Sequence, residues 1–246
     1  RGLRDKDPQK DRARYHLILI AMNDVGVRNI MRLSTVANLE GFYYFPRIDR
    51  ELLEQHSEGV IVLSGCMGSE LGQALKENRE QDAREIAEWY RRVFGDRYYL
   101  EIQDHGHPDN PIHSTEQFAI NQKVMALGKE MGIKCCVTSD AHYLTHEDQE
   151  AHEVLLCVGT GAYLSDTNRM SLRDYPLHVE EPQKIIDRWG KEYPEHILST
   201  REIAERVNFD FELGKILIPK FDVPEGETEK SYLDTLTWRG LAWRYG

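Results

Sequence analysis

The residues best suited to chemistry lie in the segment Thr138-Ser-Asp-Ala-His-Tyr143, which follows an apolar run. In extended backbone, residues i and i+2 point to the same side, so Asp140 and His142 would present a carboxylate and an imidazole to one point. An oxygen and a nitrogen donor together suit a divalent metal ion. The alternative is a hydrogen-bonded pair that only caps the following helix, and the residues alone leave both interpretations open.

Two further donors stand beside apolar runs. Cys66 follows a short β-branched run, where a thiol is either a small buried hydrophobe or a metal ligand. It is a poor candidate nucleophile, because no base lies near it in the sequence. His16 stands next to otherwise apolar residues, where a histidine is more often a satisfied core residue. Taken alone, both positions favour packing over metal binding.

Other motifs carry weaker signals. The loop 104–113 contains His105, His107 and His113, but such polar loops are commonly solvated. The pair Gly159-Thr-Gly161 lacks the lysine of a phosphate-binding loop and the third glycine of a dinucleotide fingerprint. The aromatic run 42–45 precedes a proline, which is more typical of a packed loop than of a base-stacking surface.

The composition bounds the class of protein. The chain has 246 residues with a formal net charge of -11, 40% hydrophobic and 30% charged residues, as expected of a soluble globular protein. It has no apolar run of the roughly 18–20 residues that cross a membrane. The acidic balance argues against a free-standing nucleic-acid coat, although a locally basic groove is compatible with it. The four cysteines are too few for a disulfide scaffold and indicate reduced thiols in a cytoplasmic protein.

The elements that must position these residues alternate along the chain. We expect strands at 15–22, 59–65, 98–103 and 134–140, and helices at 27–38, 70–76, 81–94, 114–131 and 147–157. This alternation predicts parallel strands with helical crossovers, either in an open sheet or in a barrel. In both folds the chemistry collects at the carboxyl ends of the strands.

The character of the sequence changes after about residue 165. Two helices are expected at 182–189 and 195–207, an extended linker with two prolines at 216–226, and a last helix at 229–245. We therefore expect residues 1–210 to form one domain and residues 211–246 to be a linker and the first helix of another. The chain begins without a methionine or a signal segment, so we expect it to start inside a longer protein.

Several segments in this order resemble the family of bacterial DNA polymerase III alpha subunits, which are replicative polymerases. The resembling residues are Tyr15-His-Leu with Asn23 and Gly26, Gly41-Phe-Tyr-Tyr, Arg47-Ile-Asp-Arg-Glu-Leu-Leu, His56-Ser-Glu-Gly, Leu63-Ser-Gly-Cys, Tyr99-Leu-Glu-Ile-Gln-Asp-His-Gly, Thr138-Ser-Asp-Ala-His-Tyr, Leu155-Leu-Cys-Val-Gly-Thr-Gly and Ile203-Ala-Glu-Arg. The stretch 219–246 also looks like the family's passage into its polymerase core. The resemblance covers nearly the whole chain.

The resemblance implies a fold of the α/β class. It is a distorted (β/α)7 barrel of the polymerase-and-histidinol-phosphatase (PHP) type, incomplete at its N-terminus, followed by a linker and a helix that lead into a separate polymerase domain. It also implies that His16, Cys66, Asp140 and His142 are metal ligands of that barrel. The three loop histidines gain nothing from it. The donors suit zinc, manganese or iron better than magnesium, which serves the polymerase site outside this chain.

The resemblance further implies an activity and partners. As a whole protein, the family performs template-directed DNA synthesis, with template-primer DNA, deoxynucleoside triphosphates, a sliding clamp and a proofreading subunit as partners. No catalytic residue for polymerisation is assignable within this chain. The PHP domain would carry a 3′–5′ proofreading exonuclease or act as a scaffold. The alternative is a free-standing PHP phosphoesterase that acts on a small phosphate ester.

Overall fold

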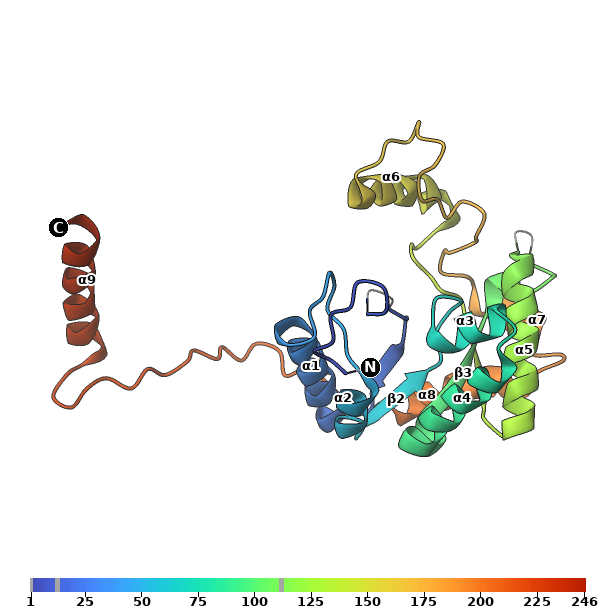
Figure 1. Ribbon diagram of the computed structural model, residues 1–246, viewed down its shortest axis with the longest axis horizontal. Helices are drawn as coiled ribbons and strands as arrows, with labels where there is room; N and C mark the ends of the chain where they lie inside the picture. Colours follow the sequence, from blue (N-terminus) through green and yellow to red (C-terminus); the bar gives the residue numbers. More distant parts are fainter. Residues whose placement is uncertain (1, 12–13, 111–112) are drawn as a thin grey trace. The chain divides into compact units, whose positions relative to one another are not determined.

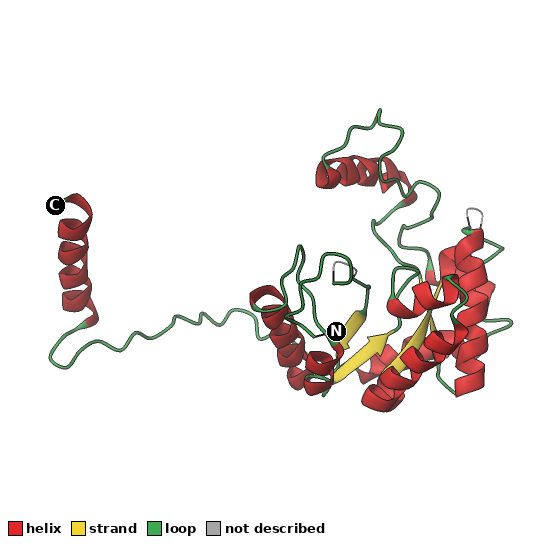
Figure 2. Ribbon diagram, in the orientation of Figure 1, coloured by secondary structure: helices red, strands yellow, loops and turns green. Residues whose placement is uncertain are grey.

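The computed structural model describes residues 2–11, 14–110 and 113–246, with strands separated by helices up to β4 and helices after it (Figures 1 and 2). The strands are β1 (Ile18–Ala21), β2 (Val60–Leu63), β3 (Tyr98–Gln103) and β4 (Cys135–Thr138). The helices are α1 (Asp24–Leu39), α2 (Arg50–Gln55), α3 (Glu70–Lys76), α4 (Glu80–Phe94), α5 (Thr115–Met131), α6 (Gln149–Thr160), α7 (Pro182–Trp189), α8 (Pro194–Arg206) and α9 (Glu229–Tyr245). Short 3₁₀ turns lie at η1 (Gly95–Arg97), η2 (Asp104–Gly106) and η3 (His146–Asp148).

The helix ends follow local capping chemistry. The Ser69 hydroxyl accepts a hydrogen bond from the Gly72 amide at 2.9 Å and begins α3 where the sequence predicted. Ser114 caps α5 in the same way, and Gly132 ends it in the left-handed conformation that glycine adopts at little cost. These caps explain why α3 has its predicted bounds and α5 differs by one residue.

The four strands form one sheet in the order β1-β2-β3-β4. β2, β3 and β4 are parallel, as predicted, but β1 runs antiparallel to β2, with Ile18 opposite Leu63 and Ala21 opposite Val60. The prediction of parallel strands throughout was therefore wrong for β1. Two helices rather than one connect β1 to β2, and the chain re-enters the sheet at the end where it left.

A close backbone contact holds both ends of this connector together. A Cβ atom on Gly26 would lie 2.0 Å from the Gly59 carbonyl oxygen, so only glycine fits there. The Met22 amide also donates to the Gly59 carbonyl at 2.8 Å. The start of α1 is thus fixed against the residue that precedes β2. The end of β1 therefore lies beside the start of β2, and the two strands run antiparallel.

The sheet has a core on each face. The larger core packs α3, α4 and α5 against one face and includes Val62, Leu100 and Cys135. The smaller core contains Leu63, Tyr99 and Cys136 of the sheet together with Ile203 of α8. As expected for a strand, adjacent Cys135 and Cys136 point to opposite faces.

A buried ion pair attaches α7 to the end of β3. Asp104 is 2% exposed, and its carboxylate accepts hydrogen bonds from Arg188 Nε at 3.0 Å and Trp189 Nε1 at 2.6 Å. Charge-assisted bonds of this kind compensate for the burial of the carboxylate. They hold α7 against the residue that follows β3 at the carboxyl end of the sheet.

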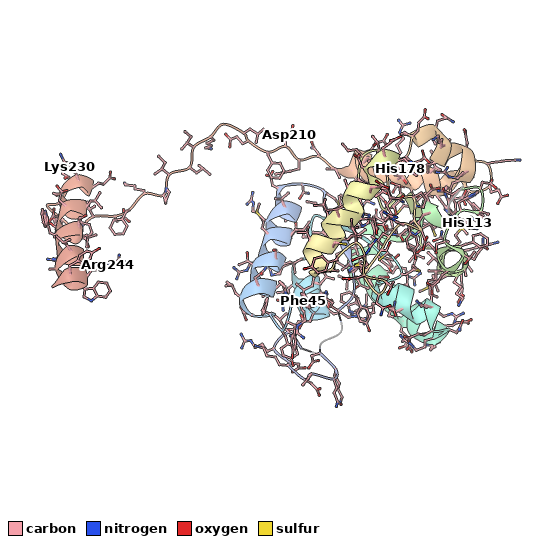
Figure 3. All side chains as sticks on the ribbon, turned by 90° about the horizontal axis from the view of Figure 1, so that it is seen from above. Phe45, His113, His178, Asp210, Lys230 and Arg244 are labelled. Atoms are coloured by element: carbon pink, nitrogen blue, oxygen red, sulfur yellow. The ribbon has the colours of Figure 1, made fainter. Side chains whose placement is uncertain are left out.

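The chain divides into two units, residues 1–209 and 210–246. The second unit is an extended segment followed by α9, which starts at a capping box between Thr228 and Ser231. Side chains after Asp210 stand along an extended backbone (Figure 3), and Leu213, Ile216 and Ile218 are more than four-fifths exposed. In the described part of the chain, no helix is both long enough and apolar enough to cross a membrane.

Candidate metal centre

One face of the sheet becomes polar toward the carboxyl ends of β3 and β4. On β3, Tyr99 lies in the smaller core, and the next residues on the same face are Glu101 and Gln103. On β4, Cys136 pairs with Glu101, and Thr138 pairs with Gln103. The polar residues of this face therefore gather at the sheet edge where the sequence predicted chemistry.

The antiparallel strand β1 brings His16 to this edge. Ile18 lies opposite Leu63, so the same register places His16 opposite Gly65. The His16 amide donates to the Gly68 carbonyl at 3.1 Å. Cys66 Sγ lies 3.4 Å from His16 Nδ1 and accepts a hydrogen bond from the Gly68 amide at 3.3 Å. Two of the four predicted ligands are thus in direct contact.

Gly65 makes the turn that presents Cys66. Its φ is +82°, a conformation that favours glycine, and a Cβ there would lie 3.0 Å from the His16 carbonyl oxygen. Burial raises the pKa of the Cys66 thiol, and the negative charges of Asp140 and Glu101 raise it further. A nearby cation would act in the opposite direction and favour the thiolate.

Asp140 and His142 lie two and four residues beyond the end of β4. Asp140 has a φ of +51°, so the segment turns there and the expectation of extended backbone does not hold. His142 Nδ1 lies 2.6 Å from the Asp140 carbonyl oxygen, and the His142 amide donates to the Leu177 carbonyl at 2.7 Å. The His142 ring is exposed, and its Nδ1 is occupied by the backbone contact.

The two pairs of predicted ligands are electrostatically coupled but do not form a closed site. Within residues 2–11, 14–110 and 113–246, no group of three or more His, Cys, Asp or Glu side chains is close enough to hold a metal ion. The charge of Asp140 nevertheless acts on Cys66, Glu101 and His105. All these side chains therefore share one region at the carboxyl end of the sheet.

Sequence reasoning left two polar residues out of this region: Glu101, which it did not consider, and His105, which it assigned to a solvated loop. Glu101 and His105 are 3% and 4% exposed, and Glu101 Oε2 and His105 Nδ1 have no hydrogen-bond partner among the described residues. Burial raises the pKa of Glu101 and lowers that of His105. A charged residue inside the apolar run 98–103 was the available signal for Glu101.

The loop 104–113 is less solvated than expected. Asp104, His105 and Gly106 form the buried turn η2, while His113 is exposed, and His107 Nδ1 accepts a hydrogen bond from the Asp109 amide at 3.1 Å. Residues 111–112 of this loop lie outside the described residues. The expectation of a solvated loop thus holds for His113 and was wrong for His105.

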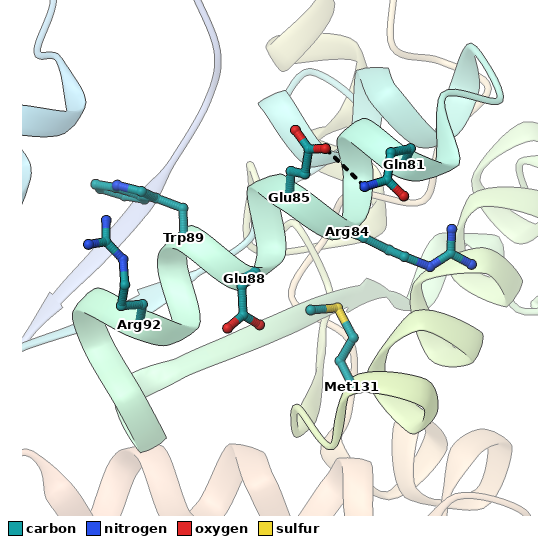
Figure 4. Close-up of a pocket in the computed structure, with 7 residues that line it drawn as sticks. All are labelled: Gln81, Arg84, Glu85, Glu88, Trp89, Arg92 and Met131. Atoms are coloured by element: carbon teal, nitrogen blue, oxygen red, sulfur yellow. Dashed lines mark hydrogen bonds between the residues drawn. The ribbon is translucent and has the colours of Figure 1, made fainter.

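Two surface cavities lie away from these residues. One of about 480 Å³ runs along α4 between Gln81 and Arg92 and reaches Met131 (Figure 4). The other, of about 860 Å³, lies between α5, the start of β4 and α8. None of the four predicted ligands lines either cavity. The candidate centre is therefore a separate feature of the strand ends.

A comparison with family models identifies the class of domain. Residues 3–105 match the family model of the PHP domain, so the chain contains a PHP domain of α/β structure with a four-stranded sheet. This segment includes both His16 and Cys66. PHP domains are generally metal-dependent, as are DNA polymerases.

The relatives of the chain are more specific. It is 37% identical to DNA polymerase III subunit alpha of Borreliella burgdorferi over 94% of this chain and 20% of that protein. It is 40% identical to DNA polymerase III subunit alpha of Deinococcus radiodurans, over 94% of this chain and 17% of that protein. The match to the Thermus aquaticus protein of the same name is 38% identical over the same share of this chain and 19% of that protein.

These comparisons confirm the resemblance found in the sequence. The chain is homologous, over almost its whole length, to one segment of DNA polymerase III alpha subunits. It spans about a fifth of the length of the curated relatives it matches.

Proposed function

We propose that this chain is part of a bacterial DNA polymerase III alpha subunit that synthesises DNA on a template during chromosome replication. The observation that carries the proposal is the similarity to such subunits over 94% of the chain. Residues 1–210 then form the larger part of a distorted (β/α)7 PHP barrel. Residues 211–246 are the linker and the first helix of the polymerase core.

The PHP domain is proposed to hold divalent metal through His16, Cys66, Asp140 and His142. Two observations support this fit: Cys66 Sγ lies 3.4 Å from His16 Nδ1, and Glu101 Oε2 is buried without a partner among the described residues. The His, thiolate and carboxylate donors suit zinc, manganese or iron. Divalent metal held by these residues would supply Lewis-acid polarisation of a phosphodiester, which is the chemistry of a 3′–5′ exonuclease.

In this proposal the residues of the chain bind and orient. His16 and Cys66 contribute from the β1–β2 edge, and Asp140 and His142 contribute from the turn after β4. The Gly68 amide, which donates to Cys66 Sγ, stabilises the thiolate form. His142 Nδ1 contacts the Asp140 carbonyl oxygen, so the lone pair of Nε2 is the one available to bind a metal ion.

The whole subunit is proposed to act in the cytoplasm on template-primer DNA and deoxynucleoside triphosphates. Its polymerase site, with magnesium, lies outside this chain, and its partners are a sliding clamp and a proofreading subunit. The acidic net charge of -11 agrees with a domain that leaves most DNA contacts to other parts of the protein.

Primer extension separates this function from that of a free-standing PHP phosphoesterase. We expect the full-length protein that carries this chain to extend a primer on a template with four deoxynucleoside triphosphates and magnesium. The 246-residue chain alone should add no nucleotide. Efficient hydrolysis of small phosphate monoesters by the full-length protein, without primer extension, would establish the phosphoesterase instead.

A further inference from the structure

Glu101 occupies an unusual place for a carboxylate. It lies in the middle of β3 between Leu100 and Ile102, both completely buried, and is itself 3% exposed. Its amide donates to Ser64 Oγ at 2.8 Å, which ties it to the end of β2. In the sheet register it pairs with Cys136 and lies in the same row as Gly65 and His16. Glu101 therefore stands between the two pairs of proposed ligands.

Among the described residues, only one oxygen of this carboxylate has a direct hydrogen-bond partner, and weaker contacts with the Gly65 amide and the Gln103 side chain act to lower its pKa. Thr138 Oγ1 donates to Oε1 at 2.7 Å, whereas Oε2 is buried and has no partner among the described residues. Within the described part of the chain, two other carboxylates are buried as deeply, and both are paired with a cation. Asp104 binds Arg188, and Glu153 binds Arg169.

The charges that act on Glu101 make this arrangement costly. No described Lys or Arg side chain forms an ion pair with Glu101. The charge that acts on the pKa of Glu101 is that of Asp140, which has the same sign and raises it. Cys66 adds to the same group as a potential thiolate. Burial of an unpaired carboxylate beside another carboxylate requires a positive ion or a proton to offset it.

We propose that Glu101 is a further protein ligand of the PHP metal centre, with Oε1 fixed by Thr138 and Oε2 available to a divalent cation. This inference rests on the proposed metal site of His16, Cys66, Asp140 and His142, and adds to it a residue from β3. It gives the unpartnered oxygen and the unpaired charge a single explanation.

The test measures metal binding and thermal stability in the full-length protein that carries this chain. Glu101→Gln keeps the shape of the side chain and removes the charge. With magnesium in excess, Zn²⁺ and Mn²⁺ are titrated, and their affinities are measured together with metal content by mass spectrometry. We expect the variant to bind these metals about 10–100-fold more weakly, and its metal-free form to melt at or above the wild-type temperature.

Glu153→Gln is the matched control, because Glu153 is an equally buried carboxylate that is fully paired through Arg169, Ser171 and Leu172. It should lower the melting temperature of the metal-free protein and leave metal affinity unchanged. Should Glu101→Gln not fold, Glu101→Asp takes its place, since withdrawal of the carboxylate by one methylene should also weaken binding.

The outcomes separate this inference from the proposal on which it rests. A folded Glu101 variant with wild-type metal affinity and a lower melting temperature would make Glu101 a structural acceptor for Thr138, and would leave the four-residue centre intact. A wild-type protein that binds neither Zn²⁺ nor Mn²⁺ would overturn the centre and the role of Glu101 together.

Discussion

Cys66 Sγ and His16 Nδ1 lie 3.4 Å apart although 50 positions separate them in the chain. Their contact depends on the direction of β1. In an all-parallel sheet, His16 would precede its strand at the edge opposite to Cys66, which follows β2. The antiparallel pairing of Ile18 with Leu63 reverses this and places both donors at one edge.

Gly26→Ala should disrupt this arrangement at its origin. The added Cβ would meet the Gly59 carbonyl oxygen at 2.0 Å, and neither backbone can move without shifting α1 or β2. We expect a loss of about 1–3 kcal/mol in the free energy of unfolding of the chain, measured with urea. Gly159→Ala is the control, because a Cβ at Gly159 meets nothing within 4 Å, and it should change stability by less than about 1 kcal/mol. Equal effects of the two substitutions would show that the Gly26–Gly59 contact is not tight.

Arg188→Ala should be far more damaging than the loss of an exposed arginine. It leaves the buried Asp104 carboxylate without its cation, which costs about 3–5 kcal/mol of unfolding free energy. Arg201→Ala removes an exposed pair with Glu205 within α8 and should cost less than about 1 kcal/mol. Urea midpoints of the two variants check this order, and a similar midpoint for both would contradict the role given to the buried pair.

Acid should release residues 169–172, which Glu153 holds through hydrogen bonds. Burial alone would raise the pKa of Glu153, but hydrogen bonds from the Leu172 amide, Arg169 and Ser171 hold it below the ordinary value of 4.5. Because the folded pKa is the lower one, this stabilisation is complete above pH 4.5 and is lost as the pH falls through the folded pKa. The measurement is hydrogen exchange of the Leu172 amide, which donates to Glu153 Oε1 at 2.9 Å.

After correction for intrinsic exchange rates, protection of the Leu172 amide should be constant from about pH 8 to 5 and fall below the ordinary carboxyl pKa. Glu153→Gln should lower this protection at every pH and remove the acid step. An acid step that persists in Glu153→Gln would assign it to another group.

The sequence was sufficient to predict most helices and strands, because the residues that start and end them are adjacent to them in the chain. Ser69 and Gly132 carry the capping signals of α3 and α5, and β3 has the predicted bounds of Tyr98–Gln103. Strand direction is different, since an apolar run of four residues has the same pattern in either direction. The antiparallel course of β1 depends on the contact between Gly26 and Gly59, which are 33 positions apart, and no local pattern predicts it.

The candidate centre was predictable in part for the same reason. Cys66 and Asp140 follow strands, and the resemblance singled them out together with His16 and His142. Glu101 was overlooked because it lies within a strand whose other residues pack, so its sequence pattern is that of a buried strand. Only the structure shows that one of its oxygens has no partner among the described residues.

The metal content of the full-length protein tests the central claim most directly. Zinc, manganese and iron are measured on folded, dialysed wild type, Asp140→Asn and His142→Ala, with His113→Ala as the control because His113 is an exposed histidine of the loop 104–113. We predict that the first two variants lose bound metal and any 3′–5′ exonuclease activity, while primer extension follows the amount of folded protein. Equal metal content in wild type, Asp140→Asn and His142→Ala would contradict the account and reduce the segment after β4 to a structural turn.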